Sequence, residues 1–474
     1  MAETMTQTPA AALKVTTSSK WIWLVLAVVV GLAIAAMPTP HGLTPIAKYV
    51  LAISGFTVVL WATPVMNNGV ASVLMMGLMV LVGVRPPLAL SGFANPPWWI
   101  LVCVLYYGFV MKKTGLAERL SYYILSLFPG TYNGILSAFF VIGFVLALGI
   151  PSMTVRTAIM TPIAWALVQS LGLPKRSHGC ALIMLTTVEM AVIPGLAFLF
   201  GSLDGPVVVA AFQAKHLPLT WAGYAQVLTF PTLLLCVLIL VGNQLVLRPE
   251  APLKTSGEFA RERLKALGAF KQQELIAAIV IVISIGLWTT KLPSFMIGMI
   301  AMAIFALAGI LRDEDIGTGV SWTLLLFIGG IFSLANAVQD YKITDWLAGY
   351  FVPIAQHITY STVLVMIVMS LIMYLLRFLD PSAFIAIPVM FLTTVDVTMA
   401  AGLPPLVLMA PLLIASVPFW LSYENFWIAM GEGITANEGF TSGQRVRLAN
   451  AYAIIALVVM VVSVGYWRLV GVLK

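Results

Sequence analysis

Stretches of apolar residues long enough to cross a lipid bilayer recur along the chain from residue 21 to residue 472. A helix that spans the hydrocarbon core needs about 20 mostly apolar residues. The composition agrees, because 61% of the 474 residues are hydrophobic and only 9% are charged, whereas soluble domains carry about 25% charged residues. The sequence therefore predicts an all-α polytopic membrane protein, embedded in a lipid bilayer, with about 11–13 transmembrane segments. It excludes secreted, cytosolic and nucleic-acid-binding classes.

The apolar segments fall into two nearly equal sets, separated by one long polar connection at residues 248–274. This connection contains six Lys and Arg and four Glu, and positively charged loops are enriched on the cytoplasmic side of membranes. We therefore expect the connection and the polar N-terminal tail, residues 1–20, to be cytoplasmic. The first membrane half is then 21–247 and the second is 275–474. The expected apolar segments are 21–38, 45–63, 66–84, 97–111, 160–172, 179–200, 225–247, 275–290, 293–311, 320–338, 360–376, 383–400, 404–431 (broken) and 449–472.

The two halves carry similar landmarks in the same order. A Trp-led apolar segment is followed by a polar turn and then by a proline-interrupted apolar segment. Trp99 to Pro162 spans 63 residues in the first half, and Trp322 to Pro388 spans 66 in the second. Internal repeats with broken apolar segments are typical of secondary transporters, whose site lies at the repeat interface near the membrane midplane. We expect two inverted repeats with re-entrant hairpins and broken helices.

Polar residues interrupt the apolar pattern at four places, near 150–157, 189–206, 377–384 and 418–432. In lipid, a broken helix is stable only where it is buried in protein or lines a water-filled cavity. We expect hairpin tips near 150–157 and 377–384, and unwound helices at the other two places. All four should meet near the midplane.

Arg156 is the most informative of these polar residues, because it stands among apolar neighbours without an acidic residue close in sequence. A charge at membrane depth costs at least about 2.5–3.5 kcal/mol and usually faces the protein interior. A guanidinium group matches the planar fork of a carboxylate, sulfate or phosphate, and Ser152, Thr154 and Thr157 could add hydroxyl donors. The pattern predicts an anion site. The alternatives are a packing or snorkelling arginine, and hydroxyls that cap or back-bond to the helix.

Four further charged residues are candidates for coupling or gating. Arg377 and Asp380 are three residues apart, the spacing of a helical ion pair, yet a carboxylate at membrane depth can also accept a proton. Glu189 and Glu424 pose the same choice, since each could instead hydrogen-bond to free backbone amides at a helix break.

Metal and redox chemistry find no support in the sequence. Cys103, Cys180 and Cys236 are far apart in apolar surroundings, and the four histidines are scattered. Neither set has the short paired spacing of zinc sites or redox motifs, so we expect no metal site and no cofactor. A membrane-embedded transferase remains a remote alternative, because the carboxylate clusters that such enzymes use, such as DDxxD, are missing from the sequence.

Several local phrases carry a family resemblance, namely Ala89-Leu-Ser-Gly-Phe-Ala-Asn95, Lys113-Thr-Gly-Leu-Ala-Glu-Arg119, Pro151-Ser-Met-Thr-Val-Arg156, the segment from Trp322 to Leu347 and the stretch near Trp467. They resemble the divalent anion:sodium symporter family, which includes dicarboxylate and citrate carriers and dicarboxylate antiporters. The resemblance extends over residues 45–474. It implies a homodimer in the cell inner membrane, in which each protomer has a scaffold part and a mobile transport part.

In this family two Ser-Asn-Thr tips bind a substrate carboxylate and help to build sodium sites. The antiporter branch continues the first tip as Pro-Ser-Asn-Thr-Ala-Arg, so Ser152, Thr154 and Arg156 inherit a substrate-binding expectation. Met153 stands in place of the first asparagine, and Phe-Leu-Asp, ending at Asp380, occupies the second tip. These changes remove side-chain oxygen ligands for sodium, which leaves backbone carbonyls to hold any sodium ion.

We therefore expect a secondary transporter of small organic dianions, such as succinate, malate or 2-oxoglutarate, that works by alternating access. Anion exchange or proton coupling is favoured over strict sodium coupling. The alternative is a carrier of sulfate, sulfonate or phosphonate in the same fold. The expected substrate-binding residues are Ser152, Met153, Thr154, Arg156, Thr157 and Ser382.

Overall fold

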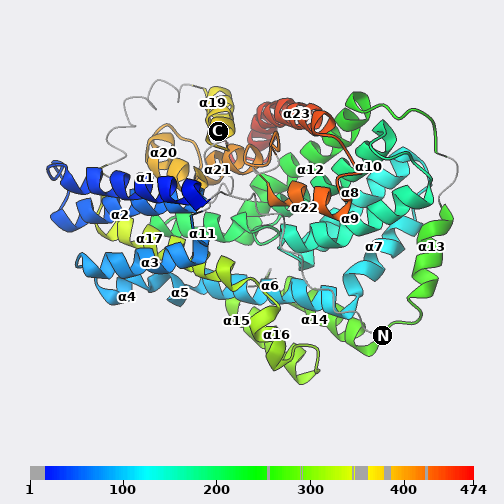
Figure 1. The fold of residues 1–474 in the computed structure, drawn as a ribbon, viewed down its shortest axis with the longest axis horizontal. Helices are drawn as coiled ribbons and strands as arrows, with labels where there is room; N and C mark the ends of the chain where they lie inside the picture. The colour runs from blue at the N-terminus through cyan, green and yellow to red at the C-terminus, as the bar shows by residue number, and fades with distance from the viewer. Residues whose placement is uncertain are drawn as a thin grey trace.

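The computed structural model describes residues 17–63, 65–253, 257–288, 290, 292–343, 346, 361–377, 386–421 and 425–473. Every regular element within these residues is a helix (Figure 1), which confirms the all-α prediction. Asp380, Ser382 and Glu424 lie outside the described residues. The second predicted hairpin tip lies mostly outside them as well.

The helices alternate between long spans and shorter pieces. In the first half they are α1 (Thr17–Ala36), α2 (Pro45–Ala62), α3 (Asn68–Leu81), α4 (Pro86–Ala89), α5 (Ser91–Ala94), α6 (Pro96–Thr114), α7 (Leu116–Ser126), α8 (Tyr132–Gly149), α9 (Met153–Ser170), α10 (His178–Val192), the 3-10 helix η1 (Ile193–Ala197), α11 (Asp204–Ala214) and α12 (Trp221–Val246). In the second half they are α13 (Gly257–Ala266), α14 (Gln272–Trp288), α15 (Ser294–Leu307), α16 (Asp313–Thr318), α17 (Trp322–Asp340), α19 (Thr362–Arg377), α20 (Ala386–Ala400), α21 (Pro405–Ile414), α22 (Phe426–Ile434) and α23 (Ser442–Leu469).

Five of the described helices are long and apolar enough to cross a membrane, or six if α6 and α7, bent by 71°, form one broken span. Eight shorter apolar helices have 10–17 residues. A span of about 30 Å needs about 20 residues at 1.5 Å each, so several of the shorter helices reach only part of the way. Re-entrant hairpins and half-helices account for such lengths.

The first hairpin consists of α8 and α9. Its turn, residues 150–152, is named the first tip. Backbone angles at Ile150 and Ser152 are extended, and Pro151 lies between them. The hydroxyl of Ser152 accepts the N–H of Val155 at 3.3 Å, which caps the start of α9. In the second half α19 and α20 flank the corresponding segment, residues 378–385, which lies outside the described residues.

Two helices are broken in the interior of the protein. The first break, residues 193–203, separates α10 from α11. Pro194 lacks the N–H that would continue α10, and the chain passes through η1 to an extended Phe198. The second break, residues 415–425, separates α21 from α22.

The two halves interlock through reciprocal contacts. α9 of the first hairpin packs against α22, and α20 of the second hairpin packs against α11. In the same way α6 packs against α15 while α17 packs against α3, and α12 packs against α23. The α9–α22 and α6–α15 contacts each have a counterpart with the halves exchanged, as two repeats related by a two-fold axis require.

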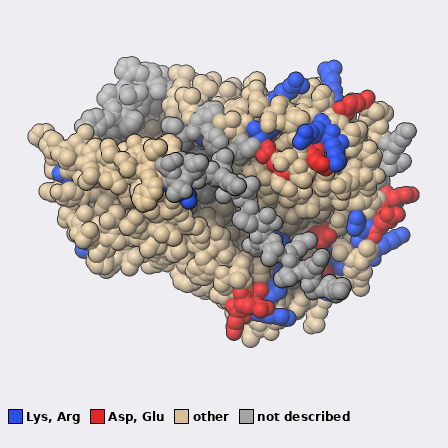
Figure 2. Space-filling model, in the orientation of Figure 1, with Lys and Arg blue, Asp and Glu red and all other residues tan. Residues whose placement is uncertain are grey.

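One end of the molecule, named the charged end, collects α7, α13, α16 and the connections 171–177, 247–253 and 435–441. Three ion pairs hold this end together. Arg119 of α7 pairs with Glu274 of α14, Lys113 of α6 pairs with Asp315 of α16, and Lys175 pairs with Glu438 between two of the connections. Figure 2 shows most charged side chains of this face gathered at that end. α6 runs toward the charged end, where α7 follows it. α17 begins beside the start of α6, because Trp98 donates its indole N–H to the carbonyl of Leu325 at 2.9 Å, and runs away from the charged end (Figure 1). The matching helices therefore run in opposite directions, which makes the repeats inverted.

Candidate functional site

Arg156 lies in the first turn of α9 and is completely buried. Its Nε donates to the carbonyl of Ala191 at 2.6 Å, and Nη2 donates to Val192 at 3.2 Å. Nη1 donates to Gly201 at 2.6 Å and also to Ile150. Four of the five guanidinium N–H groups thus bind backbone carbonyls. We name this arrangement the Arg156 anchor. It ties the first tip to the last residues of α10, Ala191 and Val192, and to Gly201 within the first break.

The other predicted residues of the first tip differ in how free they are to bind a ligand. Thr157 donates its hydroxyl to the carbonyl of Met153 at 2.8 Å, and the Met153 side chain is buried. Ser152 accepts a backbone N–H but keeps its own hydroxyl proton for a further acceptor. Thr154 is partly exposed, and its side chain makes no hydrogen bond within the described residues. Ser152 and Thr154 are therefore the hydroxyls available to a ligand here.

Arg377 plays a comparable part in the second half. It ends α19 and is buried, and its Nη2 donates to Oδ1 of Asn425 at 2.8 Å. The Asn425 amide in turn donates to the carbonyls of Val417 at 3.1 Å and Pro418 at 2.8 Å. An arginine beside a hairpin tip is thus connected to a helix break in each repeat. The predicted pairing of Arg377 with Asp380 falls outside the described residues.

Asp204 is a buried acidic residue that the sequence analysis did not single out. It begins α11, and its Oδ2 accepts the hydroxyl of Ser202 at 3.1 Å. Its charge interacts with those of both Arg156 and Arg377. An acidic residue two positions before Pro206 in an apolar segment was the signal that could have identified it.

Glu189 lies on α10, four residues before the first break begins at Ile193, and is completely buried. Oε2 accepts the side-chain amide of Asn243 from α12 at 2.5 Å. Oε1 has no hydrogen-bond partner within the part of the chain that the structure describes. The carboxyl group is thus held by one amide donor and by no ion pair among those residues.

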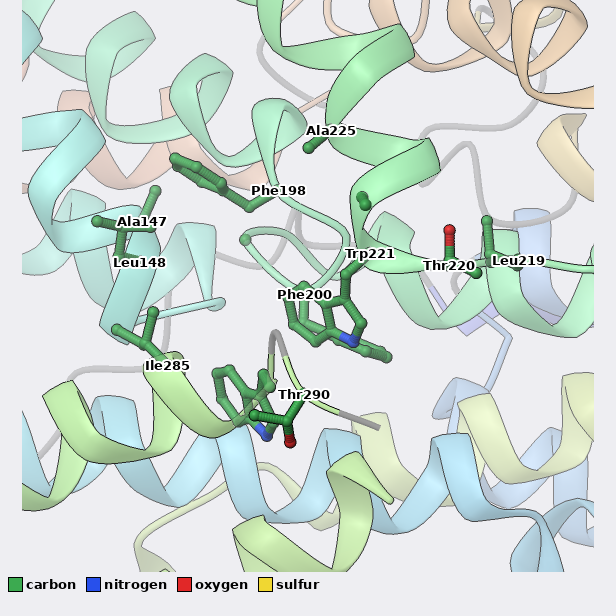
Figure 3. Close-up of a pocket in the computed structure, with 13 residues that line it drawn as sticks. Ala147, Leu148, Phe198, Phe200, Leu219, Thr220, Trp221, Ala225, Ile285 and Thr290 are labelled. Atoms are coloured by element: carbon green, nitrogen blue, oxygen red, sulfur yellow. The ribbon is translucent and has the colours of Figure 1, made fainter. Parts of the chain in front are cut away.

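A row of cavities leads from the first break toward the end opposite the charged end. The first, about 490 Å³, includes Phe198 and Gly201 of the break in its lining. Figure 3 shows residues from α8, from the break, from the start of α12 and from the end of α14 converging on it. A cavity of about 330 Å³ shares Phe200 and Trp221 with the first. Through Gln213 it adjoins a third cavity of about 520 Å³.

The third cavity is the most charged of the three. Lys215, His216 and Lys342 line it together with Asp340. Lys215 also pairs with Asp396 at 2.6 Å. Lys215 and Lys342 thus place positive charge at the mouth of the row of cavities, beside the carboxylates of Asp340 and Asp396.

Potential metal ligands are dispersed. Within the described ranges, no three His, Cys, Asp or Glu side chains lie close enough together to hold a metal ion.

Comparison with known proteins gives matches along nearly the whole chain. The family described as sodium:sulfate symporter transmembrane region matches residues 18–473. The L-tartrate/succinate antiporter of Escherichia coli O6:K15:H31 is 24% identical over 497 aligned residues, covering 95% of this chain and 94% of the antiporter. Dicarboxylate transporter 1 of spinach (Spinacia oleracea) chloroplasts is 24% identical, covering 81% of this chain and 69% of the transporter.

Two solved structures share the fold. The YdaH transporter of Alcanivorax borkumensis has a TM-score of 0.58 at 15% identity, covering 95% of this chain and 97% of its own. MtrF of Neisseria gonorrhoeae has a TM-score of 0.55 at 15% identity, covering 95% and 94%. At such identity the likeness concerns the fold alone. The family match over residues 18–473, together with the apolar helices, shows that the chain belongs to the sodium:sulfate symporter family, the divalent anion:sodium symporters, and is a multi-pass membrane transporter of anions rather than an enzyme.

Proposed function

We propose that this protein carries small organic dianions, dicarboxylates such as succinate, malate or 2-oxoglutarate, across the cell inner membrane by alternating access. The observation that carries the proposal is the pair of buried guanidinium groups, Arg156 and Arg377, each next to a hairpin tip and connected to a break. Two fixed positive charges, with Asp204 interacting with both, leave a net positive centre that suits an anion. The substrates named for the tartrate/succinate antiporter and the chloroplast transporter support the choice of dicarboxylates.

In this proposal the first tip contacts one substrate carboxylate. Ser152 and Thr154 offer hydroxyl donors, and the first turn of α9 leaves backbone N–H groups without helical partners. Arg156 contributes its charge, and as a positioning residue it keeps the tip against the first break. The predicted role of Ser382 at the second tip follows from the pseudo-symmetry of the repeats.

Access alternates as the hairpins and broken helices move as one part against the remaining helices. The charged cavity beside Lys215 and His216 serves as the outer vestibule. We further propose that the protein is a homodimer and that its N-terminus and charged end are cytoplasmic, since basic residues accumulate on the cytoplasmic side.

Sodium is not required in this scheme. Met153 brings a thioether to the position where the family has an asparagine, and hard cations prefer oxygen ligands. Exchange of one anion for another, or uptake together with protons, is the proposed mode of coupling.

Uptake of radiolabelled succinate, malate and 2-oxoglutarate into proteoliposomes tests the proposal, with and without internal dicarboxylate and sodium. We expect uptake without sodium, and at least tenfold weaker apparent affinity in Ser152→Ala and Thr154→Ala if each removes about 1.4 kcal/mol of binding. Ser121→Ala is the matched control, because Ser121 is buried on α7 and bonds only to the carbonyl of Ala117. A strict sodium requirement, or transport of sulfate to the exclusion of dicarboxylates, contradicts the proposal.

A further inference from the structure

Glu189 is a buried carboxyl group without a compensating cation. Its side chain and those of its neighbours Thr186 and Asn243 are all at most 1% exposed. Asn243 divides its amide donors between Oε2 of Glu189 and the hydroxyl of Thr186, the latter at 3.0 Å. Oε1 accepts no hydrogen bond within the described part of the chain. A carboxylate this poorly compensated is far less stable than the neutral acid.

The surroundings of Glu189 supply no positive charge that would keep it ionised. From the helices that pack against α10, the nearest titratable groups are Cys236 on α12 and Tyr452 on α23, which are ordinarily neutral at pH 7. Arg156 on α9 directs its guanidinium to backbone carbonyls.

The remaining titratable groups on the packed helices are tyrosines, exposed arginines and one ion pair. Tyr224 of α12 donates its hydroxyl to the carbonyl of Leu196 at 3.1 Å, Tyr466 of α23 donates to the carbonyl of Gln226 at 3.0 Å, and Arg447 and Arg468 of α23 are exposed. Tyr132 and the ion pair lie toward the charged end. Tyr132, at the start of α8, lies against Gly179. On α22, Glu432 pairs with Arg445 of α23. Neither lies at the depth of Glu189, which is ten residues along α10 from Gly179.

Glu189 is also connected to the Arg156 anchor by a short piece of backbone. The carbonyl of Glu189 accepts the N–H of Ile193, where α10 gives way to η1. Ala191 and Val192, which lie between Glu189 and Ile193, have the carbonyls that Arg156 binds. A change in the charge of Glu189 therefore acts within one helical turn on the segment that the anchor holds.

We propose that Glu189 is the proton-binding site that couples dicarboxylate transport to the proton gradient, with Asn243 as its positioning residue. The inference rests on the proposed function and names the group that carries the proton. Glu189 is protonated when the interior is closed around it, as here. When the transport part faces one side, water reaches the carboxyl group, which takes up or releases a proton to that solution. The neutral acid then crosses the membrane with the bound anion.

Proteoliposomes with an imposed pH gradient, acidic outside, test this coupling. We expect the wild type to accumulate labelled succinate above equilibrium. Glu189→Gln, which mimics the neutral acid, should keep succinate–succinate exchange but lose the acid-driven accumulation, so that the inside-to-outside ratio falls to one. Glu250→Gln, a carboxyl at the charged end, is the control and should accumulate succinate as the wild type does.

A second variant decides the matter if Glu189→Gln fails to fold. Asn243→Ala removes the amide that favours the charged carboxylate, so the pH midpoint of succinate uptake should move upward, and an unchanged midpoint overturns the inference. The inference is also overturned if Glu189→Gln still accumulates succinate under the acidic gradient, or if the wild type transports succinate but its accumulation does not depend on the pH gradient. Both of these outcomes leave the proposed function intact. Absence of any dicarboxylate transport in the wild type defeats the proposed function itself.

Discussion

Gly195 lies directly against the guanidinium group of Arg156. A Cβ atom on Gly195 would stand 2.5 Å from Nη2, and closer still to the carbonyl oxygen of Gly201. Real Cβ atoms do not approach other heavy atoms this closely. The absence of a side chain at position 195 is thus what allows the first break to close around the anchor.

Gly195→Ala should therefore loosen the break. Forcing one methyl group into a tightly packed interior costs about 1–3 kcal/mol, so we expect a clear fall in the midpoint of thermal unfolding in detergent, together with slower transport. Gly77→Ala on α3 is the control, because a Cβ there meets nothing within 4 Å. Alanine in an exposed helix is more favourable than glycine by up to about 1 kcal/mol. Equal stability of the two variants would mean that the break has room to adjust.

Arg119 and Glu274 form a buried ion pair that fastens the long connection to α7. Nε and Oε2 are 2.7 Å apart, and the side chains are 5% and 3% exposed. Arg119 also donates to the carbonyl of Gly268 at 2.8 Å. Removing one partner of such a pair leaves a buried charge and costs about 3–5 kcal/mol, so Glu274→Ala should unfold at a markedly lower temperature.

The exposed pair Lys175–Glu438 provides the matched comparison for this prediction. Its side chains are 67% and 37% exposed, and exposed pairs contribute about 0–1 kcal/mol. Lys175→Ala should therefore leave the unfolding temperature nearly unchanged. If Glu274→Ala is as stable as Lys175→Ala, the connection is not held by the buried pair.

Most of the fold could be predicted from the sequence, including a hairpin tip near 150–157, where the turn between α8 and α9 lies, but the helices that flank this tip were not delimited correctly. The expected segments omitted α8 (Tyr132–Gly149), although it is as apolar as α10, and began α9 at residue 160 instead of Met153. The bend after α6 carried a usable signal, because Gly115 has φ +87°, the left-handed conformation that commonly ends a helix after basic residues.

The sequence predicted the candidate site only in part: it indicated where Arg156 lies but not which groups it binds. The cost of an intramembrane charge placed Arg156 in the interior, where the structure has it. Its partners Ala191 and Gly201 are 35 and 45 residues away, and their carbonyls are invisible in the sequence because every residue has one. Direct contact of Arg156 with substrate stays a prediction.

Glu250 gives a prediction for pH dependence. Its carboxylate accepts the N–H groups of His178 at 2.6 Å and Gly179 at 3.2 Å, at the start of α10. Burial acts to raise the pKa of Glu250, but these donors outweigh it and hold the pKa below its ordinary value. A carboxylate with a lowered folded pKa stabilises the fold above the unfolded pKa, about 4.3, and loses that effect as the pH falls through the folded pKa.

Glu250→Gln should therefore lower the unfolding temperature at pH 7, and the difference from wild type should shrink as the pH falls from about 5 toward 3. The effect should be small, since Glu250 is exposed. Glu258→Gln, an exposed residue of α13, should match the wild type throughout. If the difference in unfolding temperature between Glu250→Gln and wild type instead grows as the pH falls, the pKa of Glu250 is not lowered in the folded protein and the prediction is wrong.

The orientation of the inverted repeats can be tested with two exposed cationic residues. Arg85 pairs with Asp340 at the end opposite the charged end and is 73% exposed, whereas Lys175 lies at the charged end and is 67% exposed. The three native cysteines are buried, so Arg85→Cys and Lys175→Cys, each with the native cysteines retained, add one exposed cysteine and give a clean signal. If the charged end is cytoplasmic, a membrane-impermeant maleimide added to intact cells should label only the cysteine at position 85, and permeabilised cells should label both. The two side chains are similarly exposed, so a difference in labelling reports the side of the membrane that each one faces. Labelling of position 175 alone in intact cells would therefore mean that the topology is the reverse of the proposed one.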